Sequence, residues 1–429
     1  MDTKQRSRRH FLRDGAALAG MAVAGVRLAK GQAQAEKSAA SVAGSDNGEA
    51  TAPFRLFGPE APLYGTPSEN LQRMPTIEYP FATRTPQQDL HGIITPSGLH
   101  FVVNHGSPTP DINLLEHRFL IHGMVDRPLL FTVAELKRLP SVSRVHFLAC
   151  AGNSYVDTFA RKNLPQSVQE THGATSCSEW TGVPLSVLLQ EAGVQKGASW
   201  LLCEGADLKK HSISIPLTKA MDDAMVAYVQ NGEAVRRENG YPLRLLVPGF
   251  EGTRNVKWLR RIKVVDRPYM TKWETGVYTN LLPSGKARWF QFEIEPNSVI
   301  TRPSAGLHMA GRGFCEITGI AWSGGGTIRR VEVSTNGGRT WKDAELQHPV
   351  LPKAHTRFRF PWNWNGEETV IQSRSTDEWG HVQPTLAELT KIWGVTMDFW
   401  RTDTARIQHF NASHPWTIKP DGSLRNEIW

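Results

Sequence analysis

The stretch HFLACAGNS (residues 146–154) is an apolar, strand-like run that ends abruptly in Cys150 and a set of small residues. A hydrophobic core would normally continue with bulky side chains, whereas Ala151, Gly152 and Asn153 leave space beside the thiol. Small residues after a strand let the backbone approach a bulky ligand closely. Cys150 is therefore either a buried cysteine that packs as a small hydrophobe or a thiolate that binds a soft metal.

A basic segment lies about one hundred positions downstream. It reads NGEAVRRENGYPLRLLVPGFEGTRNVKWLRRIKV (residues 231–264) and contains two Gly-rich turns. Arg244 stands between leucines, and Lys257 between a valine and a tryptophan, so both are expected to be partly buried and directed at an anion such as a phosphate. For Arg260 and Arg261 the ordinary interpretation, a solvated basic face, is the better one.

Residues 86–284 show short β-like runs that alternate with helical patterns. The runs FLIHGMV (119–125) and RVHFLAC (144–150) are predicted to be strands. Apolar residues recur at three- and four-residue spacing in TVAELKRL (132–139) and PLSVLLQEAGV (184–194), which predicts helices, the second closed by a glycine. The sequence thus indicates a mixed α/β domain.

The hydrophobic period changes beyond residue 285. GTIRRVEVSTNGGRTWKDAEL (326–346) alternates apolar and polar residues and turns at Asn336-Gly337, a strong hairpin signal. TRFRFPWNW (356–364) and ETVIQSRS (368–375) continue the alternation. This predicts an immunoglobulin-like β-sandwich over residues 285–395, usable for dimerisation, and gives the chain an α+β fold class with a C-terminal tail at 396–429.

The N-terminus has the order of an export signal. Residues 1–35 contain the basic SRRHFLR, an apolar stretch of small residues, and AQA. The pair Arg8-Arg9 before Phe11 predicts twin-arginine export of the folded protein to the periplasm, which suits a chain that acquires a cofactor first. The alternative is a basic N-terminal helix of the folded protein. Residues 36–85 are expected to form a tether and an extended arm.

Charge and cysteine content exclude several classes. Residues 1–35 carry seven Lys or Arg against two Asp, which leaves +3 of the formal +8 for the rest and weakens a nucleic-acid interpretation. No later segment has 18 uninterrupted apolar residues, so no membrane span is expected in the mature chain. Four cysteines do not make a disulfide scaffold, and the redox states of Cys177, Cys203 and Cys315 stay open.

Four stretches together resemble the sulfite oxidase family of molybdenum enzymes, and within it the molybdenum subunits of bacterial sulfane dehydrogenases of the Sox sulfur-oxidation system. In chain order they are RVHFLACAGN, HGATSCSEWTGVPLSVLL, NGYPLRLLVPGFEGTRNVKWLRRIKV and GIAWSGGGTIRRVEVSTNGGRTW. The resemblance covers about residues 85–390. It implies the sulfite oxidase fold for the mixed domain and one molybdopterin, whose dithiolene holds molybdenum together with one protein cysteine.

The resemblance implies a role for each matching residue in the first half of the domain. Cys150 would be the thiolate that binds molybdenum, and the small residues after it would make room for the pterin. Asn104 and His105 in FVVNH match a cofactor-contacting Asn-His pair, with an ordinary turn as the alternative. Asp207 in CEGAD matches an acid that accepts hydrogen bonds from the pterin, with a loop cap as the alternative.

The same holds further along the chain. Arg244 and Lys257 match contacts to the cofactor's phosphate and pterin. Tyr278 in ETGVYTN matches a catalytic tyrosine beside the metal, against a plain core tyrosine. By hydrogen bonding there, it would stabilise developing charge.

Three departures from the family pattern alter the expected substrate. Val103 and Trp393 stand where sulfite oxidases have arginines, and Asn239 stands where they have a histidine. Because such cations hold the sulfite dianion, their loss predicts a less cationic pocket. Free sulfite becomes the poorer candidate, and a neutral or protein-carried sulfur group the better one.

The resulting hypothesis is a periplasmic molybdenum oxidoreductase that oxidises sulfane sulfur on a carrier protein by oxygen-atom transfer. The sequence contains no C-x-x-C-H haem motif, so a c-type cytochrome partner is expected to accept the electrons, in a homodimer or heterotetramer. The alternatives are a sulfite dehydrogenase acting on free sulfite and an exported anion-binding protein without catalysis. The sequence has neither a G-x-S-x-G nor an H-E-x-x-H motif, which argues against a hydrolase.

Overall fold

The computed structural model describes residues 77–79, 82–105, 108–154, 166–289, 292–401 and 410–426. The predicted export signal and most of the predicted arm lie outside these residues. Where the description begins, three short strands form a small antiparallel sheet in the order β1 (Ile77–Tyr79), β2 (Ala82–Arg84) and β3 (Val102–Val103). Among the described residues, no helix has the length and apolar character needed to cross a membrane.

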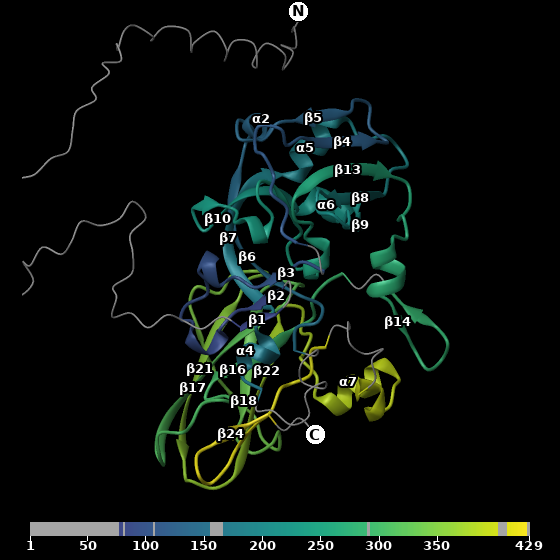
Figure 1. Cartoon of the computed structure of the whole chain (residues 1–429). Helices are drawn as coiled ribbons and strands as arrows, with labels where there is room; N and C mark the ends of the chain where they lie inside the picture. The colour runs from purple at the N-terminus through teal and green to yellow at the C-terminus, as the bar shows by residue number, and fades with distance from the viewer. Residues whose placement is uncertain are drawn as a thin grey trace, which may run out of the picture. The chain divides into compact units, whose positions relative to one another are not determined.

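The mixed domain contains two five-stranded sheets, and its first sheet carries the HFLA run (Figure 1). That sheet is antiparallel and consists of β6 (Val142–Ala149), β7 (Thr175–Pro184), β10 (Met225–Gln230), β11 (Glu233–Ala234) and β12 (Arg244–Leu246). The strand predicted at 144–150 is confirmed as β6. It ends at Ala149, so Cys150 is the first residue beyond the sheet.

The second sheet has the order β5 (Leu129–Phe131), β4 (Phe119–Gly123), β13 (Leu259–Val265), β8 (Trp200–Gly205), β9 (Ser212–Pro216). Only β13 and β4 run parallel, which requires a long crossover between them. Apolar side chains from both sheets and from α5 (Leu185–Ala192) share one core; they include Ile121, Val183, Leu188, Leu201, Val226 and Ile262. Mixed α and β content is thereby confirmed.

Short helices complete the domain, and two of them have well-defined end signals, of which the sequence predicted the glycine that closes α5. In α2 (Val133–Leu136) Thr132 and Glu135 form a reciprocal capping box. Gly193 ends α5 in the left-handed conformation, at a φ of 71°. The other short helices are α4 (Val168–His172), α6 (Leu217–Asp222), η2 (Gln87–Asp89), η3 (Ser97–Leu99), η4 (Arg237–Asn239), η5 (Gly252–Arg254) and the π-helical η6 (Trp273–Val277).

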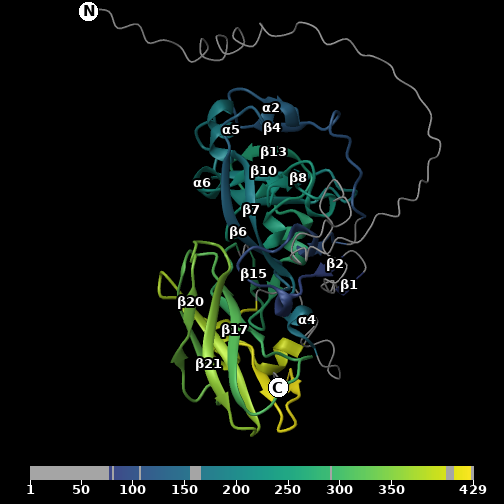
Figure 2. The same cartoon turned by 90° about the vertical axis from the view of Figure 1, so that its left-hand side faces the viewer.

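The predicted β-sandwich is confirmed, and Figure 2 shows several of its strands. One sheet has the order β16 (Asn297–Arg302), β17 (Gly313–Trp322), β21 (Thr356–Trp364), β20 (Glu345–Gln347). The other contains β19 (Lys342–Asp343), β18 (Ile328–Ser334) and β22 (Thr369–Asp377). The turn predicted at Asn336-Gly337 joins β18 to β19, with Gly337 at a φ of 71°.

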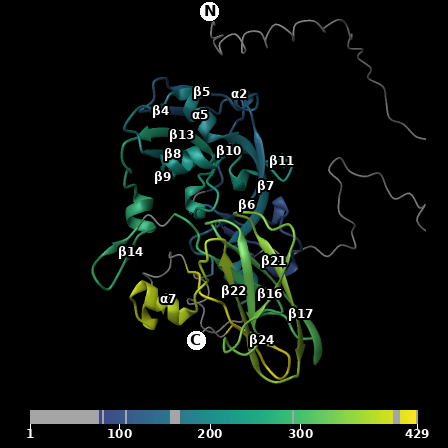
Figure 3. The ribbon, with the colours of Figure 1, turned by 180° about the vertical axis from the view of Figure 1, so that it is seen from behind.

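Part of the predicted C-terminal tail belongs to the sandwich. β23 (Trp416–Ile418) pairs with β22, and β24 (Leu424–Arg425) pairs with β23. Figure 3 labels β22 and β24 in the sandwich. The physical reason is burial, because Trp416 and Ile418 are both fully buried in the sandwich core. Two further pairs of elements flank the sandwich in sequence: β14 (Asn280–Leu281) with β15 (Ala287–Arg288), and α7 (Leu386–Trp393) with η7 (Met397–Arg401).

The sandwich and the strand that leads to Cys150 share contacts. Phe147 of β6 and Cys177 of β7 belong to the sandwich's core cluster. His355 stacks on Phe147 at a centroid separation of 6.2 Å, and its Nε2 lies 3.0 Å from the Thr175 hydroxyl. Lys353 pairs with Asp223 at 2.6 Å. The sandwich therefore packs against the end of β6 and against the neighbouring strand β7.

Acid should weaken this junction. Burial lowers the pKa of His355 from 6.5 to about 3, so the unfolded chain binds a proton at this residue below about pH 6.5 while the folded chain does not until about pH 3. Stability should fall as the pH falls through that window, since the unfolded state binds more protons there. We expect the thermal unfolding midpoint of His355→Gln to depend less on pH between 6.5 and 4 than that of the wild type or of exposed His91→Gln. Equal slopes in all three proteins would contradict this assignment.

Candidate active site

One cavity collects every residue that the sequence nominated. About 680 Å³ of space, including open solvent, lies between its lining atoms. Its walls are built from the ends of β3, β6, β8, β12 and η6 and from the loop before β13. All seven predicted residues line it: Asn104, His105, Cys150, Asp207, Arg244, Lys257 and Tyr278.

Cys150 lies where the first sheet meets the cavity. Its backbone N–H donates to the Ala174 carbonyl at 2.9 Å, which fixes the residue at the strand end. A side chain at Gly252 would lie 3.0 Å from the Ala149 carbonyl oxygen and 3.5 Å from the Cys150 Cα, so a larger residue there would force the opposing loop to shift by a few tenths of an ångström. Burial raises the pKa of the Cys150 thiol, and a metal that displaced the proton would stabilise the thiolate.

The loop that brings Gly252 to this place is closed by Asn255, which is 2 % exposed. Its Oδ1 accepts from the Val247 N–H at 2.7 Å, and its Nδ2 donates to the Glu251 carbonyl at 3.0 Å. Its own carbonyl accepts from Arg244 at 3.2 Å. The sequence interpretation missed Asn255, although its place within VPGFEGTRN, between two predicted cofactor contacts, was the available signal.

Arg244 is a buried cation without a counter-charge. It is 4 % exposed, and its guanidinium lies 4.9 Å from the centroid of the Trp180 ring. One terminal nitrogen donates to the Asn239 carbonyl at 2.8 Å, whereas Nε has no hydrogen-bond partner. Burial lowers the pKa of Arg244 to about 9, so it stays charged at neutral pH. Because no described carboxylate lies within ion-pair distance, an anionic ligand is the natural partner.

Lys257 supplies the second cation and connects to the predicted Asn-His pair. Its Nζ donates to Asn104 Oδ1 and, at 2.8 Å, to the Glu238 carbonyl. Burial, with Arg244 as the next cause, holds the pKa of Lys257 well below its ordinary value. A bound anion would offset both effects and favour the charged amine. Asn104 itself is 6 % exposed and also donates to Thr109 Oγ1 at 3.1 Å.

Asp207 lines the cavity and also caps its own loop. Its carboxylate accepts hydrogen bonds from the backbone N–H groups of Lys209 at 3.2 Å and His211 at 2.9 Å. These contacts show that Asp207 caps its own loop, which was the alternative to a pterin contact. A carboxylate has further acceptor positions, so capping leaves room for a ligand's N–H groups.

Histidines form one side of the cavity, and the sequence interpretation missed two of them. His105, in the left-handed region at a φ of 49°, stacks on His211 with ring centroids 5.2 Å apart and lies 4.6 Å from the Trp273 ring. Burial, with His211 as the next cause, lowers the pKa of His105 to about 3. Burial likewise lowers the pKa of His100 to about 3. His100 and His211 occur singly in the sequence, without ligand spacing, and gave no signal.

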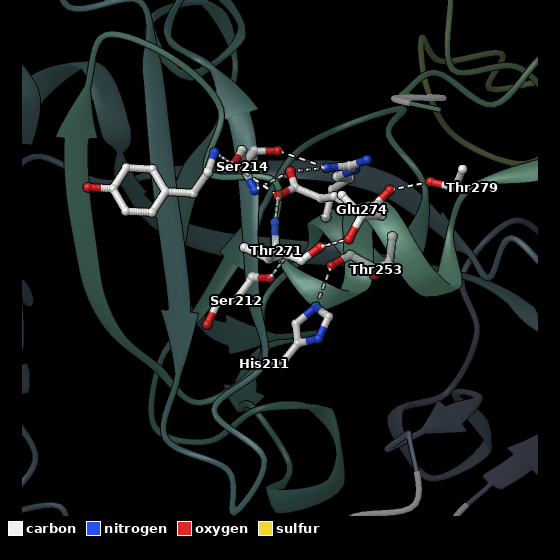
Figure 4. Close-up of polar contacts among 10 residues, drawn as sticks. His211, Ser212, Ser214, Thr253, Thr271, Glu274 and Thr279 are labelled. Carbon is white, nitrogen blue, oxygen red and sulfur yellow. Dashed lines mark hydrogen bonds and ion pairs between the residues drawn. The ribbon is translucent and has the colours of Figure 1, made fainter. Parts of the chain in front are cut away.

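Tyr278 is positioned by a buried carboxylate. It follows η6, where its N–H donates to the Trp273 carbonyl at 2.9 Å. Figure 4 shows the contacts around Glu274, which is 1 % exposed and accepts from the backbone N–H groups of Ser214 at 2.8 Å and Thr271 at 2.9 Å. Glu274 also pairs with buried Arg254 at 3.3 Å. Burial raises the pKa of Tyr278, so its phenol stays protonated and remains a hydrogen-bond donor.

The three departures from the family pattern do not share one location. Val103 and Asn239 line the cavity. Trp393 is not among the lining residues; it packs in a separate cluster with Trp400, at a centroid separation of 5.5 Å, and lies under the Arg288 guanidinium. Only the first two replacements therefore alter the pocket itself.

The residues present fit a molybdopterin. Among the described residues no group of three His, Cys, Asp or Glu could hold a metal ion. Four buried atoms of lining residues lack a hydrogen-bond partner, as expected where a polar ligand binds: His100 Nε2, His211 Nδ1, Arg244 Nε and Thr253 Oγ1. Arg244 and Lys257 would hold its phosphate and pterin, and Cys150 its metal. All four cysteines are free, including Cys177, Cys203 and Cys315.

Comparison with known proteins identifies the family. The family model of the oxidoreductase molybdopterin binding domain matches residues 105–273, and that of the Mo-co oxidoreductase dimerisation domain matches residues 288–406. The chain belongs to the sulfite oxidase family of molybdopterin oxidoreductases. It is an enzyme family whose cofactor is molybdenum-molybdopterin.

The similar proteins carry different names. The crystal structure of the sulfane dehydrogenase SoxCD from Paracoccus pantotrophus matches with a TM-score of 0.77 and 38% identity, over 87% of this chain and 95% of that one. A NADH nitrate reductase of Solanum lycopersicum is 34% identical over 367 residues, which is 75% of this chain but 39% of the relative. NADH nitrate reductase 1 of Arabidopsis thaliana is 36% identical over 329 residues. The chain thus spans about two fifths of the curated relatives' length.

Arg244→Met should reduce cofactor retention. The substitution keeps most of the side-chain volume but removes a buried cation, and charged hydrogen bonds contribute about 1.5–3 kcal/mol each. We expect molybdenum per protein to fall about tenfold or more, measured by mass spectrometry of metals after gel filtration. Arg260→Met, which changes a surface cation paired with Glu204, is the matched control and should retain full occupancy. Equal occupancy in the two variants would remove Arg244 from the cofactor site.

Proposed function

We propose that this molybdenum oxidoreductase oxidises sulfane sulfur bound to a carrier protein and passes the electrons to a c-type cytochrome in the periplasm. The observation that carries the proposal is the replacement of two cationic family positions by Val103 and Asn239 within the cavity wall. A pocket with fewer cations binds a dianion less well and tolerates a neutral or thioether-like sulfur group.

The electrostatics of the remaining wall support the same substrate class. His105 and His100 are kept neutral by burial, since the pKa of each is lowered to about 3. The Arg244 guanidinium is directed by hydrogen bonds to the carbonyls of Asn239 and Asn255, and Lys257 is engaged by Asn104. Both cations thus suit the cofactor's anionic part, and a substrate entering beside Tyr278 meets neutral side chains.

The side chains around the reacting centre have separate tasks. The bound molybdenum cofactor supplies two-electron oxygen-atom transfer. Cys150 would bind the metal at the end of β6. Tyr278, protonated and held by the Glu274 contacts, donates a hydrogen bond to oxygen as charge develops there. His105 and His211 stack in the cavity wall, and the Trp273 ring packs against both.

Partners follow from the same proposal. The match to a dimerisation domain supports an oligomer, which we take to be a homodimer of this chain or a heterotetramer with a cytochrome subunit. The likeness to a structure named sulfane dehydrogenase SoxCD supports this assignment. The twin-arginine pattern at Arg8-Arg9 supports export.

Sulfite and nitrate are the two alternative substrates to be tested beside the carrier-bound sulfane sulfur. Free sulfite is favoured by the cations that remain in the cavity, and nitrate by the names of the curated relatives. We expect the molybdenum-loaded enzyme to reduce cytochrome c with a thiosulfate-loaded carrier protein at least about tenfold faster than with sulfite, equivalent to about 1.4 kcal/mol in transition-state stabilisation. Cys150→Ser should abolish molybdenum content and activity together. Faster turnover of sulfite, or reduction of nitrate by the loaded enzyme, would contradict the assignment.

Tyr278→Phe should separate chemistry from cofactor binding. The phenyl ring keeps the packing against His105, whose centroid lies 6.1 Å away, but cannot donate a hydrogen bond. We expect kcat to fall by about 10²-fold, as for loss of a preorganised donor, with molybdenum content unchanged. Steady-state kinetics and metal analysis on the same preparation measure both. A kcat equal to that of the wild type would make Tyr278 a packing residue only.

A further inference from the structure

A second pocket lies where the segment before β3 meets the sandwich. It contains about 850 Å³ of empty space and is bordered by Gly92 and Ile93, by β20, by the His348-Pro349 turn, and by Arg357 and Arg359 of β21. All its lining residues belong to the described part of the chain, and none of them lines the candidate active site. The proposed function leaves it unassigned.

Strand geometry places both arginines at this pocket. Arg357 and Arg359 alternate with Phe358, which is fully buried in the sandwich core, so the two guanidinium groups leave the sheet on the opposite face. Their register partners on β20 are Gln347 and Glu345. The face carries two cations and one carboxylate.

Arg357 is the informative residue because it is a nearly buried cation with free donors. It is 6 % exposed, and its Nε donates to the Gly92 carbonyl at 2.6 Å. Its two terminal nitrogens have no hydrogen-bond partner and no carboxylate within ion-pair distance among the described residues. Neither terminal nitrogen is among the fully buried atoms without a partner, and Arg357 lines this pocket. The two nitrogens are therefore accessible from the pocket. Burial lowers the pKa of Arg357 to about 10, which leaves it charged at neutral pH.

Arg359 adds a second incompletely satisfied group. Its Nε is buried without a hydrogen-bond partner. Its terminal nitrogen lies 3.4 Å from Glu345, in a pair whose side chains are 41% and 69% exposed. Solvent screens such exposed pairs, so Glu345 neutralises the pocket only weakly.

We propose that this pocket binds a small tetrahedral oxyanion of the sulfate or phosphate class between Arg357 and Arg359. The planar guanidinium offers parallel N–H donors, which match the oxygens of such an anion. The anion supplies the counter-charge that Arg357 lacks. This site is separate from the active site and does not depend on the proposed function.

Calorimetric titration of sodium sulfate into the full-length, molybdenum-loaded protein tests the proposal, with sodium chloride at matched ionic strength as the reference. Arg357→Met and Arg359→Met should each weaken sulfate binding about tenfold or more, as expected for lost charged hydrogen bonds. Arg339→Met, at an exposed arginine of the same sandwich, is the control and should leave the affinity unchanged. Since Arg359 is half-exposed, its variant keeps the test informative should Arg357→Met fail to fold.

Anomalous diffraction from crystals soaked in selenate locates the anion. The expected result is a selenium peak within hydrogen-bond distance of both guanidinium groups, absent from Arg359→Met crystals. Sulfate affinity unaltered in Arg359→Met, a selenium peak only in the active-site cavity, or a peak without calorimetric binding would overturn the proposal. A carboxylate from a second copy of the chain seated on Arg357 would overturn it equally.

Discussion

The closed loop between β12 and β13 is the constraint on which the site depends. Asn255 ties this loop to itself through side-chain bonds to the backbone at Val247 and Glu251, so the loop has one shape. That shape presses Gly252 against the end of β6 and directs the Asn255 carbonyl at Arg244. The distance between the Cys150 thiol and the two cavity cations is thereby set by backbone geometry.

The cavity separates charge by burial. Arg244 keeps its proton because even its lowered pKa, about 9, lies above neutral pH, whereas the histidines lose theirs because the same desolvation acts on a group of much lower ordinary pKa. The cavity consequently contains a charged Arg244, while His105, whose ring lies beside Tyr278, is neutral. A ligand with an anionic end and a neutral reacting end matches this polarity, which is why we assign the cations to the cofactor.

The sandwich, which matches the family model of a dimerisation domain, also packs against the strand that leads to Cys150. Phe147 of β6 packs in the sandwich core, and His355 of the segment before β21 stacks on it. Movement of the sandwich would shift the strand end at which Cys150 stands. The buried ion pair of Arg254 and Glu274 similarly stabilises the turn of η6 that precedes Tyr278.

Local sequence determined the elements and nominated the residues. The apolar run before Cys150, the glycine that ends α5 and the turn at Asn336-Gly337 all act over a few residues, so they were predictable and are confirmed. The seven nominated residues all line one cavity, because the family resemblance carried information about their arrangement. Their individual roles stay predictions.

Tertiary structure decided what depends on contacts distant in sequence. The rings of His105 and His211 stack although these residues are far apart in the sequence, and β23 pairs with β22 some forty residues earlier. No local sequence pattern predicts either contact. The family resemblance assigned Trp393 to an arginine position of the pocket, yet it packs with Trp400 in another cluster. Burial also decided charge: composition counts Lys257 and His105 among the chain's ionisable groups, but only the folded surroundings lower their pKa values. The physical reason is that desolvation is a property of position in the fold.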